Sequence, residues 1–222
     1  MAHYFGFKPS EKLDAMLNEA DELITNGADV EYYPYRNAIA QQIAREIIDN
    51  LLVSLIDVIP SPERQASMRK IVHSIESSTE TLLKVLLGKD ENADVIPTFN
   101  FLKDDSLFID NAGERRIGLK LPEDSAKEIN ASFAAVTPES VDIDKFKHGL
   151  QIMNNEVLDH FITRFTGTLK LGMFKRKAVP VAKAAINKGL DMAINKLFPQ
   201  LPDDSLNRLA EFYRPFIVEI NE

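Results

Sequence analysis

Apolar residues recur every three or four positions through most of the chain, which is the spacing of amphipathic helices. This spacing predicts helices over residues 10–26, 36–58, 61–88, 123–135, 142–171, 179–198 and 204–213. Within 36–58 the apolar pairs recur every four residues, so the apolar stripe winds around the helix and must contact several neighbours. We therefore expect this helix at the centre of the core.

The pattern changes between about residues 98 and 121, where apolar and polar residues alternate. Alternation is typical of strands that bury one face. Three such runs are present, separated by the turn-forming stretches 103–105 and 111–113: Phe99/Phe101, Leu107/Ile109 and Ile117/Leu119/Leu121. The predicted fold is therefore mainly α, a multi-helix bundle with a small inserted antiparallel three-stranded β-meander at about residues 98–121.

The length and composition favour one domain over residues 1–222. The chain is 45% hydrophobic and 27% charged, which is ordinary for a globular protein. The polar stretch near residue 90 permits a subdivision into an N-terminal helical part (1–90), the small β-meander (95–121) and a C-terminal helical part (122–222).

The cysteine count and the apolar stretches restrict the class of protein. The chain has no cysteine, which excludes disulfides, cysteine-based zinc sites and cysteine nucleophiles. The first residues lack a basic region followed by an apolar run, so no signal peptide is expected. The most apolar stretch, 39–59, carries four charged residues, which disfavours a membrane span. We expect a cytoplasmic protein without a cofactor.

One pair of residues suggests a metal site. Glu156 and His160 are one helical turn apart, and side chains at this spacing converge in the metal sites of helical bundles. Arg164 follows one turn later on the same ridge and would repel a divalent cation. Plain helix-surface pairing is therefore the favoured interpretation, and a metal-dependent enzyme using this Glu/His cluster is the alternative.

Charge is distributed unevenly along the chain. The whole sequence has 26 basic and 34 acidic residues and a net charge of −8. Segment 164–196, called the basic segment below, contains only one acidic residue, Asp191, and eight basic residues: Arg164, Lys170, Lys175, Arg176, Lys177, Lys183, Lys188 and Lys196. The charge is densest at 175–177, which we place in a loop just before the helix 179–198.

This uneven charge carries the functional prediction. We expect a non-catalytic binding or adaptor protein that engages an acidic or anionic partner through Lys170, Lys175, Arg176, Lys177 and Lys183. A protein partner or a homo-oligomer is favoured, an anionic ligand is possible, and nucleic acid or a membrane surface is less favoured because few aromatic residues accompany the cations. The competing interpretation is that the basic segment only balances acidic helices of its own chain.

Overall fold

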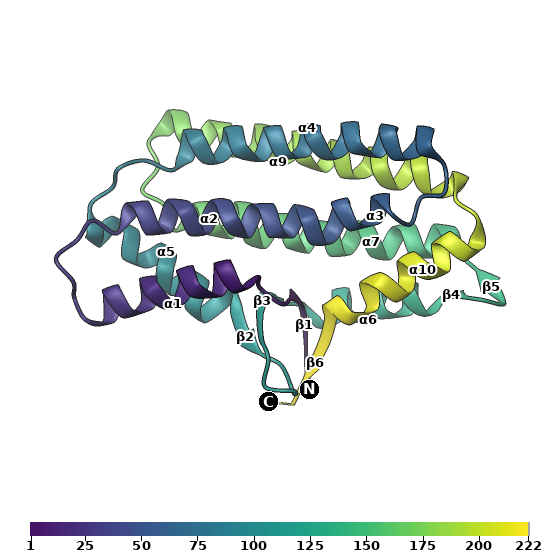
Figure 1. Ribbon diagram of the computed structural model, residues 1–222, viewed down its shortest axis with the longest axis horizontal. Helices are drawn as coiled ribbons and strands as arrows, with labels where there is room; N and C mark the ends of the chain where they lie inside the picture. The colour runs from purple at the N-terminus through teal and green to yellow at the C-terminus, as the bar shows by residue number, and fades with distance from the viewer. Residues whose placement is uncertain (222) are drawn as a thin grey trace.

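The protein is a layered helical assembly, seen in a computed structural model that describes residues 1–221, apart from the side chains of Lys196 and Leu197 (Figure 1). Helices α4 (Pro62–Leu86) and α9 (Met173–Met192) lie side by side in one layer. Helices α2 (Tyr33–Ile48) and α7 (Ile143–Leu158) lie beneath them, and a small sheet projects from the far side. The mainly α prediction is confirmed.

Most predicted helices form where the sequence signals them. Helix α1 (Glu11–Thr25) begins after Ser10, whose hydroxyl accepts a hydrogen bond from the backbone N–H of Leu13. Ser61 caps α4 in the same way, and such caps satisfy N–H groups that have no partner within the helix. The remaining predicted helices are α6 (Glu123–Ala134) and α10 (Asp203–Tyr213).

Three long helices contain a π-helical segment. Helix α2 continues through η1 (Asp49–Val53) into α3 (Ser54–Ile56), and α7 continues through η2 (Asp159–Arg164) into α8 (Phe165–Gly167). Helix α9 continues into η3 (Ala193–Leu197), followed by the short 3-10 helix η4 (Phe198–Gln200). A π turn holds an extra residue, so it changes the direction in which the following side chains point.

The sheet joins the two ends of the chain to its middle. Its strands are β1 (Ala2–Phe7), β2 (Leu107–Ile109), β3 (Arg115–Lys120) and β6 (Ile217–Ile220), in the order β2-β3-β1-β6 with every pair antiparallel. Strand β6 follows the 3-10 turn η5 (Arg214–Phe216), and a separate hairpin contains β4 (Val136–Thr137) and β5 (Ser140–Val141). Ala2 pairs with Ile220, so both ends lie together in Figure 1.

The predicted meander is only partly present. Its second and third strands are β2 and β3, but the predicted strand at Phe99 and Phe101 is wrong, because these residues lie in helix α5 (Asn92–Asp105). Buried Val95, Phe99 and Leu102 are spaced as on one helix face. Phe101 is also buried, so apolar residues stand on either side of Asn100 and the sequence alternates as a strand would. The partner missing from the prediction is β1, 110 or more residues away in the sequence.

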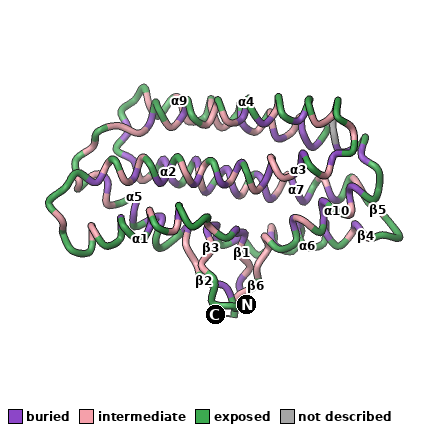
Figure 2. The backbone as a smooth tube through the Cα atoms, viewed as in Figure 1, coloured by how far each residue is buried: buried purple, intermediate pink, exposed green. Residues whose placement is uncertain are grey.

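One apolar core runs through the layers. Buried residues of α2, α4 and α7 belong to this core, and buried positions recur at intervals along α2 and α4 in Figure 2. Helices α4 and α9 approach closely at Gly189, where an added Cβ would lie 2.7 Å from Cγ1 of Ile75. The proposed subdivision at residue 90 stays a prediction. Within residues 1–221, no helix is both long and apolar enough to cross a membrane.

Candidate functional site

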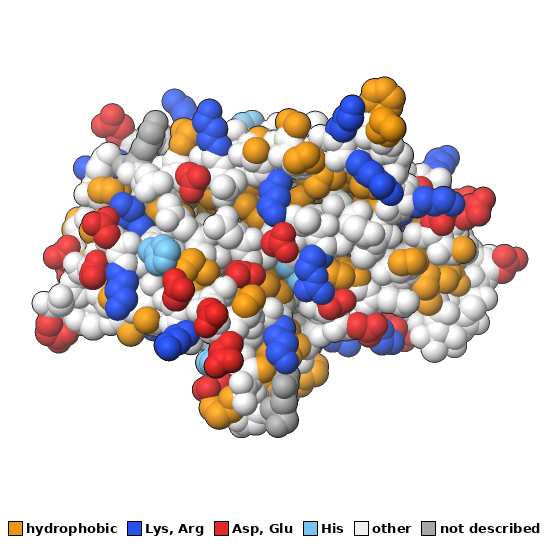
Figure 3. Space-filling view, turned by 180° about the vertical axis from the view of Figure 1, so that it is seen from behind, with side chains coloured by type: hydrophobic (Ala, Val, Ile, Leu, Met, Phe, Trp, Pro, Cys, Tyr) orange, Lys and Arg blue, Asp and Glu red, His pale blue; other side chains and the backbone are white. Residues whose placement is uncertain are grey.

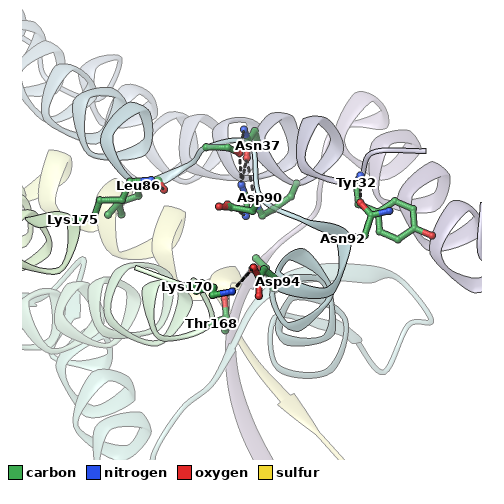
Figure 4. Close-up of polar contacts among 12 residues, drawn as sticks. Tyr32, Asn37, Leu86, Asp90, Asn92, Asp94, Thr168, Lys170 and Lys175 are labelled. Atoms are coloured by element: carbon green, nitrogen blue, oxygen red, sulfur yellow. Dashed lines mark hydrogen bonds and ion pairs between the residues drawn. The ribbon is translucent and has the colours of Figure 1, made fainter. Parts of the chain in front are cut away.

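Several cations of the basic segment bind groups of their own chain. Lys170 Nζ lies 3.0 Å from an Asp94 carboxylate oxygen, and Lys175 Nζ donates to the Leu86 carbonyl at 3.0 Å (Figure 4). The hydrogen bond to Asp94 raises the pKa of Lys170. These two lysines therefore hold the α4–α5 connection against the start of α9.

Two further cations pair on other elements. Lys183 Nζ lies 3.1 Å from an Asp159 carboxylate oxygen and 2.7 Å from the Thr163 hydroxyl. Burial raises the pKa of Asp159, but the hydrogen bonds from Lys183 and Thr163 outweigh it, so the net shift is downward. Arg164 pairs with Asp105 at 2.8 Å. Lys170, Lys175 and Lys183, all predicted partner-binding residues, are thus engaged within the chain.

Three other cations of the segment have no partner among the described residues. Arg176, Lys177 and Lys188 are exposed, and their side chains form no ion pair or hydrogen bond with the residues that the structure describes. The side chain of Lys196 lies outside the described residues. The prediction of a loop at 175–177 is wrong, because α9 begins at Met173. Pro180 lies inside this helix, where its missing N–H leaves the carbonyl of residue 176 without its usual donor.

Exposed apolar side chains accompany the free cations. Phe174 is 91% exposed and Val181 71%. At 100° per residue, Phe174, Lys177, Val181 and Lys188 fall within one narrow stripe of α9, which we call the α9 edge. Arg176 lies on a different side of the helix. In Figure 3, hydrophobic side chains project from the upper margin of the molecule beside Lys and Arg side chains.

A groove runs along the α9 edge. It has a volume of about 370 Å³ and lies between α4 and α9. Its lining consists mainly of small or aliphatic side chains, among them Ser78, Thr81, Val85, Ala182 and Ala185. Small side chains allow another backbone to approach closely, and exposed Val85 and Val181 give the groove apolar walls.

The two candidate metal ligands have separate partners. Glu156 accepts a hydrogen bond from the Ser125 hydroxyl of α6 at 2.6 Å. His160 is 2% exposed and its Nε2 lies 2.8 Å from the Ser106 hydroxyl. Among the described residues, no three His, Asp or Glu side chains are grouped so that they could hold a metal ion. The geometry gives the alternative of a metal site at Glu156 and His160 no support, and the favoured helix-surface pairing is wrong for His160, because its ring is buried.

The Ser106–His160 pair is arranged for structure rather than for nucleophilic attack. Nδ1 of His160 lies 3.2 Å from a nitrogen of Arg164, which can only donate. Burial, with a further contribution from Arg164, lowers the pKa of His160 to about 4. The neutral ring therefore carries its proton on Nε2 and donates it to Ser106. A serine nucleophile needs the opposite, an unprotonated nitrogen facing its hydroxyl.

The sequence contained the components of the α9 edge but did not bring them together. Segment 164–196 identified the cations, but it could not show that three of them pair with acids and that a fourth donates to a backbone carbonyl. Pro180 suggested a helix start at residue 179, which left Phe174 outside the predicted helix. The alignment of Phe174 with Val181 was therefore missed. With the helix begun at Met173, their seven-residue spacing would have placed them on one face.

Comparisons with models of known protein families, with curated proteins and with solved structures found no match to this chain.

Proposed function

We propose that this chain is a non-catalytic binding protein that holds an acidic, amphipathic helix of a partner protein on the α9 edge. The observation that carries the proposal is a 91% exposed Phe174 on the same helix stripe as the unpaired cations Lys177 and Lys188. Aromatic side chains are enriched at protein interfaces, and lysines beside them select a partner of opposite charge.

The shape of the groove favours a helix as the bound element. Grooves between two helices accept the apolar face of a third helix, which anchors at intervals of three and four residues. Lys177 and Lys188 are 11 residues apart, which is about 16 Å along the helix axis. A partner helix lying along α9 would therefore carry acidic residues about three turns apart, in one row along a single flank of its apolar face.

Charge disfavours the other occupants. A second copy related by a two-fold axis would bring the same lysines against each other, and like charges at an interface oppose association. A bilayer surface would attract the lysines, but it is flat and would leave the concave groove unfilled. An acidic helix satisfies both the charge and the groove.

A charge-swap experiment tests the proposal. The probe is a fluorescein-labelled synthetic helix with leucine and alanine on one face and glutamates 11 residues apart. The double variant K177Q/K188Q should weaken its binding roughly tenfold, and F174S by a similar factor, since 1.4 kcal/mol corresponds to tenfold. The matched control K127Q/K145Q removes two exposed lysines from α6 and α7 and should bind as the wild type does.

Rescue makes the result specific. A peptide with lysines in place of the glutamates should bind K177E/K188E and not the wild type. Binding should also weaken with added salt, because exposed ion pairs are screened. No binding of the acidic peptide by the wild type, or equal loss in K127Q/K145Q, would contradict the proposal. Binding to phosphatidylserine vesicles without binding to the peptide would identify a membrane surface instead.

A further inference from the structure

The bundle contains an apolar cavity. It has a volume of about 100 Å³ and lies between α2, α4 and α7, with side chains of α8 and α9 closing it. Its lining is almost entirely aliphatic and aromatic, and the polar side chains among the lining are only Thr79, Asn154 and Thr166. An apolar cavity of this kind stays dry and can take up a small apolar group.

Two π-helical segments shape this cavity. Leu51 and Leu52 of η1 line it from one side, and Phe161 and Ile162 of η2 line it from another. Regular helices would turn different side chains toward this space, because each π turn holds one extra residue. The cavity is thus lined by π-helical segments of two elements, and π turns are frequent at functional sites.

A second, polar cleft adjoins the cavity. It has a volume of about 380 Å³ and lies between α2 and α4 at the surface. The cleft and the cavity share four lining residues: Ala44, Ile48, Thr79 and Leu83. Of these, Ala44, Thr79 and Leu83 are partly exposed. The polar cleft and the apolar cavity are therefore separated only by these side chains, three of which solvent can reach.

Arg45 stands in the polar cleft without a partner. Lys84, which also lines the cleft, lies 3.5 Å from a Glu80 carboxylate oxygen, and Glu76 lies 3.8 Å from His73. Arg45 is exposed, and no described residue forms an ion pair or hydrogen bond with its side chain. A guanidinium presents several N–H donors in a plane that match the two oxygens of a carboxylate or the oxygens of a phosphate.

From this arrangement we infer that the bundle binds a small amphiphile, with an anionic head on Arg45 and an aliphatic tail in the cavity beyond Ala44. The cavity alone is smaller than the 300–1,000 Å³ typical of whole-ligand sites, so the tail is short and the outer cleft holds the head. The site is separate from the α9 edge, because it opens between α2 and α4.

The experiment measures binding of octanoate by calorimetry, below the concentration at which it forms micelles. Butyrate has the same head with a shorter tail, octanol the same tail with a neutral head, and octyl phosphate the other anionic head. Octanoate or octyl phosphate should bind at least roughly tenfold more tightly than butyrate and octanol. The anion that binds more tightly, octanoate or octyl phosphate, shows whether the site prefers a carboxylate or a phosphate head group.

Variants assign the two ends of the ligand. R45Q should weaken octanoate binding roughly tenfold and leave octanol binding unchanged, whereas the control R69Q, on the exposed part of α4, should alter neither. Ala40→Leu fills the cavity and should abolish binding of both. Ala44→Leu enlarges the side chain between the cleft and the cavity at a partly exposed position, so it serves as the second filling variant if Ala40→Leu does not fold, as judged by thermal unfolding.

The outcomes separate clearly. The cavity assignment would be overturned if octanoate bound no more tightly than butyrate and bound the folded filling variant as tightly as the wild type. Octanol or octylammonium that binds as tightly as octanoate would overturn the role of Arg45. Wild-type protein that binds none of the eight-carbon compounds would overturn the inference as a whole.

Discussion

Two basic residues among those described are almost completely buried in this bundle, and one is charged whereas the other is neutral. Arg36 is 1% exposed and His160 is 2% exposed. Arg36 donates to an Asp90 carboxylate oxygen at 2.7 Å, to the Gly88 carbonyl at 2.9 Å and to the Asn37 side chain. A guanidinium keeps its proton in proteins, so the fold surrounds it with acceptors.

The surroundings of His160 are the reverse. Its ring packs against Phe101, with centroids 4.8 Å apart, and its nearest charged neighbour is the cation Arg164. An imidazole can release its proton, and burial beside a cation makes it do so. The comparison teaches that a buried basic group is stable in this core either when acceptors saturate it or when it is neutral.

Breaking the Arg36 cluster should have the largest effect. The variant R36M keeps the apolar stem but leaves Asp90 and the Gly88 carbonyl without their donor. Removal of one partner of a buried pair costs about 3–5 kcal/mol, and the lower end is expected because Asp90 is 30% exposed. Urea unfolding at pH 7 measures this loss. A loss below about 1 kcal/mol would show that the cluster is dispensable.

Acid should break the His160 cluster next. The unfolded chain binds a proton at His160 near pH 6.5, whereas the folded chain binds it only near pH 4. Stability from this residue is therefore present above pH 6.5 and is lost as the pH falls toward 4. The shift from 6.5 to about 4, at 1.36 kcal/mol per unit, corresponds to about 3 kcal/mol.

The control for this prediction is H160Q, whose amide can still donate to Ser106 but does not titrate. The difference in unfolding free energy between wild type and H160Q should narrow or reverse between pH 7 and pH 4.5. A difference that is constant over this range would contradict the assignment of a neutral, buried ring.

A neutral partner for Arg36 should have an intermediate effect. The variant D90N keeps the shape of the cluster and removes its negative charge, and Arg36 cannot respond by losing its proton. Hydrogen bonds to charged groups contribute about 1.5–3 kcal/mol, so a loss near 2 kcal/mol is expected. Urea unfolding at pH 7 measures this loss, which should be smaller than that of R36M.

The smallest effect should come from Arg164 and appear in a titration. Removing the guanidinium in R164Q should raise the pKa of His160 toward 6.5, but leave it lower than 6.5, because burial is the larger cause of the shift. Stability at pH 7 should change little, since exposed pairs such as Arg164–Asp105 contribute about 0–1 kcal/mol. NMR titration of the imidazole protons measures the pKa, and R176Q is the surface-charge control.

Local signals predicted the helices well and the sheet poorly. Ser61, Pro62 and Glu63 mark a helix start within three residues, and α4 begins there. Strand β1 has no such signal, because its sequence AHYFGF does not alternate regularly between apolar and polar residues and its partners lie more than 100 residues away. The FNF alternation at 99–101 is typical of a strand, but these residues lie in α5. A helix that is covered on two sides can also bury both phenylalanines.

The candidate site was predictable in composition but not in geometry. The cations of segment 164–196 are visible in the sequence, but the pairing of Lys170 with Asp94 spans 76 residues. No local pattern distinguishes this lysine from free Lys177. The cavity was still harder to predict from the sequence, because π turns depend on how neighbouring helices pack. The role proposed for Arg45 depends on residues that line both the cavity and the polar cleft.

The pairing of β1 with β6 has a consequence for synthesis on the ribosome. Phe5 emerges more than 200 residues ahead of Ile217, its partner in β6. At about 5–20 residues per second, β1 waits roughly ten seconds or longer for this neighbour. Until then one edge of an apolar strand offers open N–H and C=O groups, and such edges pair with other chains. On a polysome, strand β6 must therefore pair with β1 before a neighbouring nascent chain does.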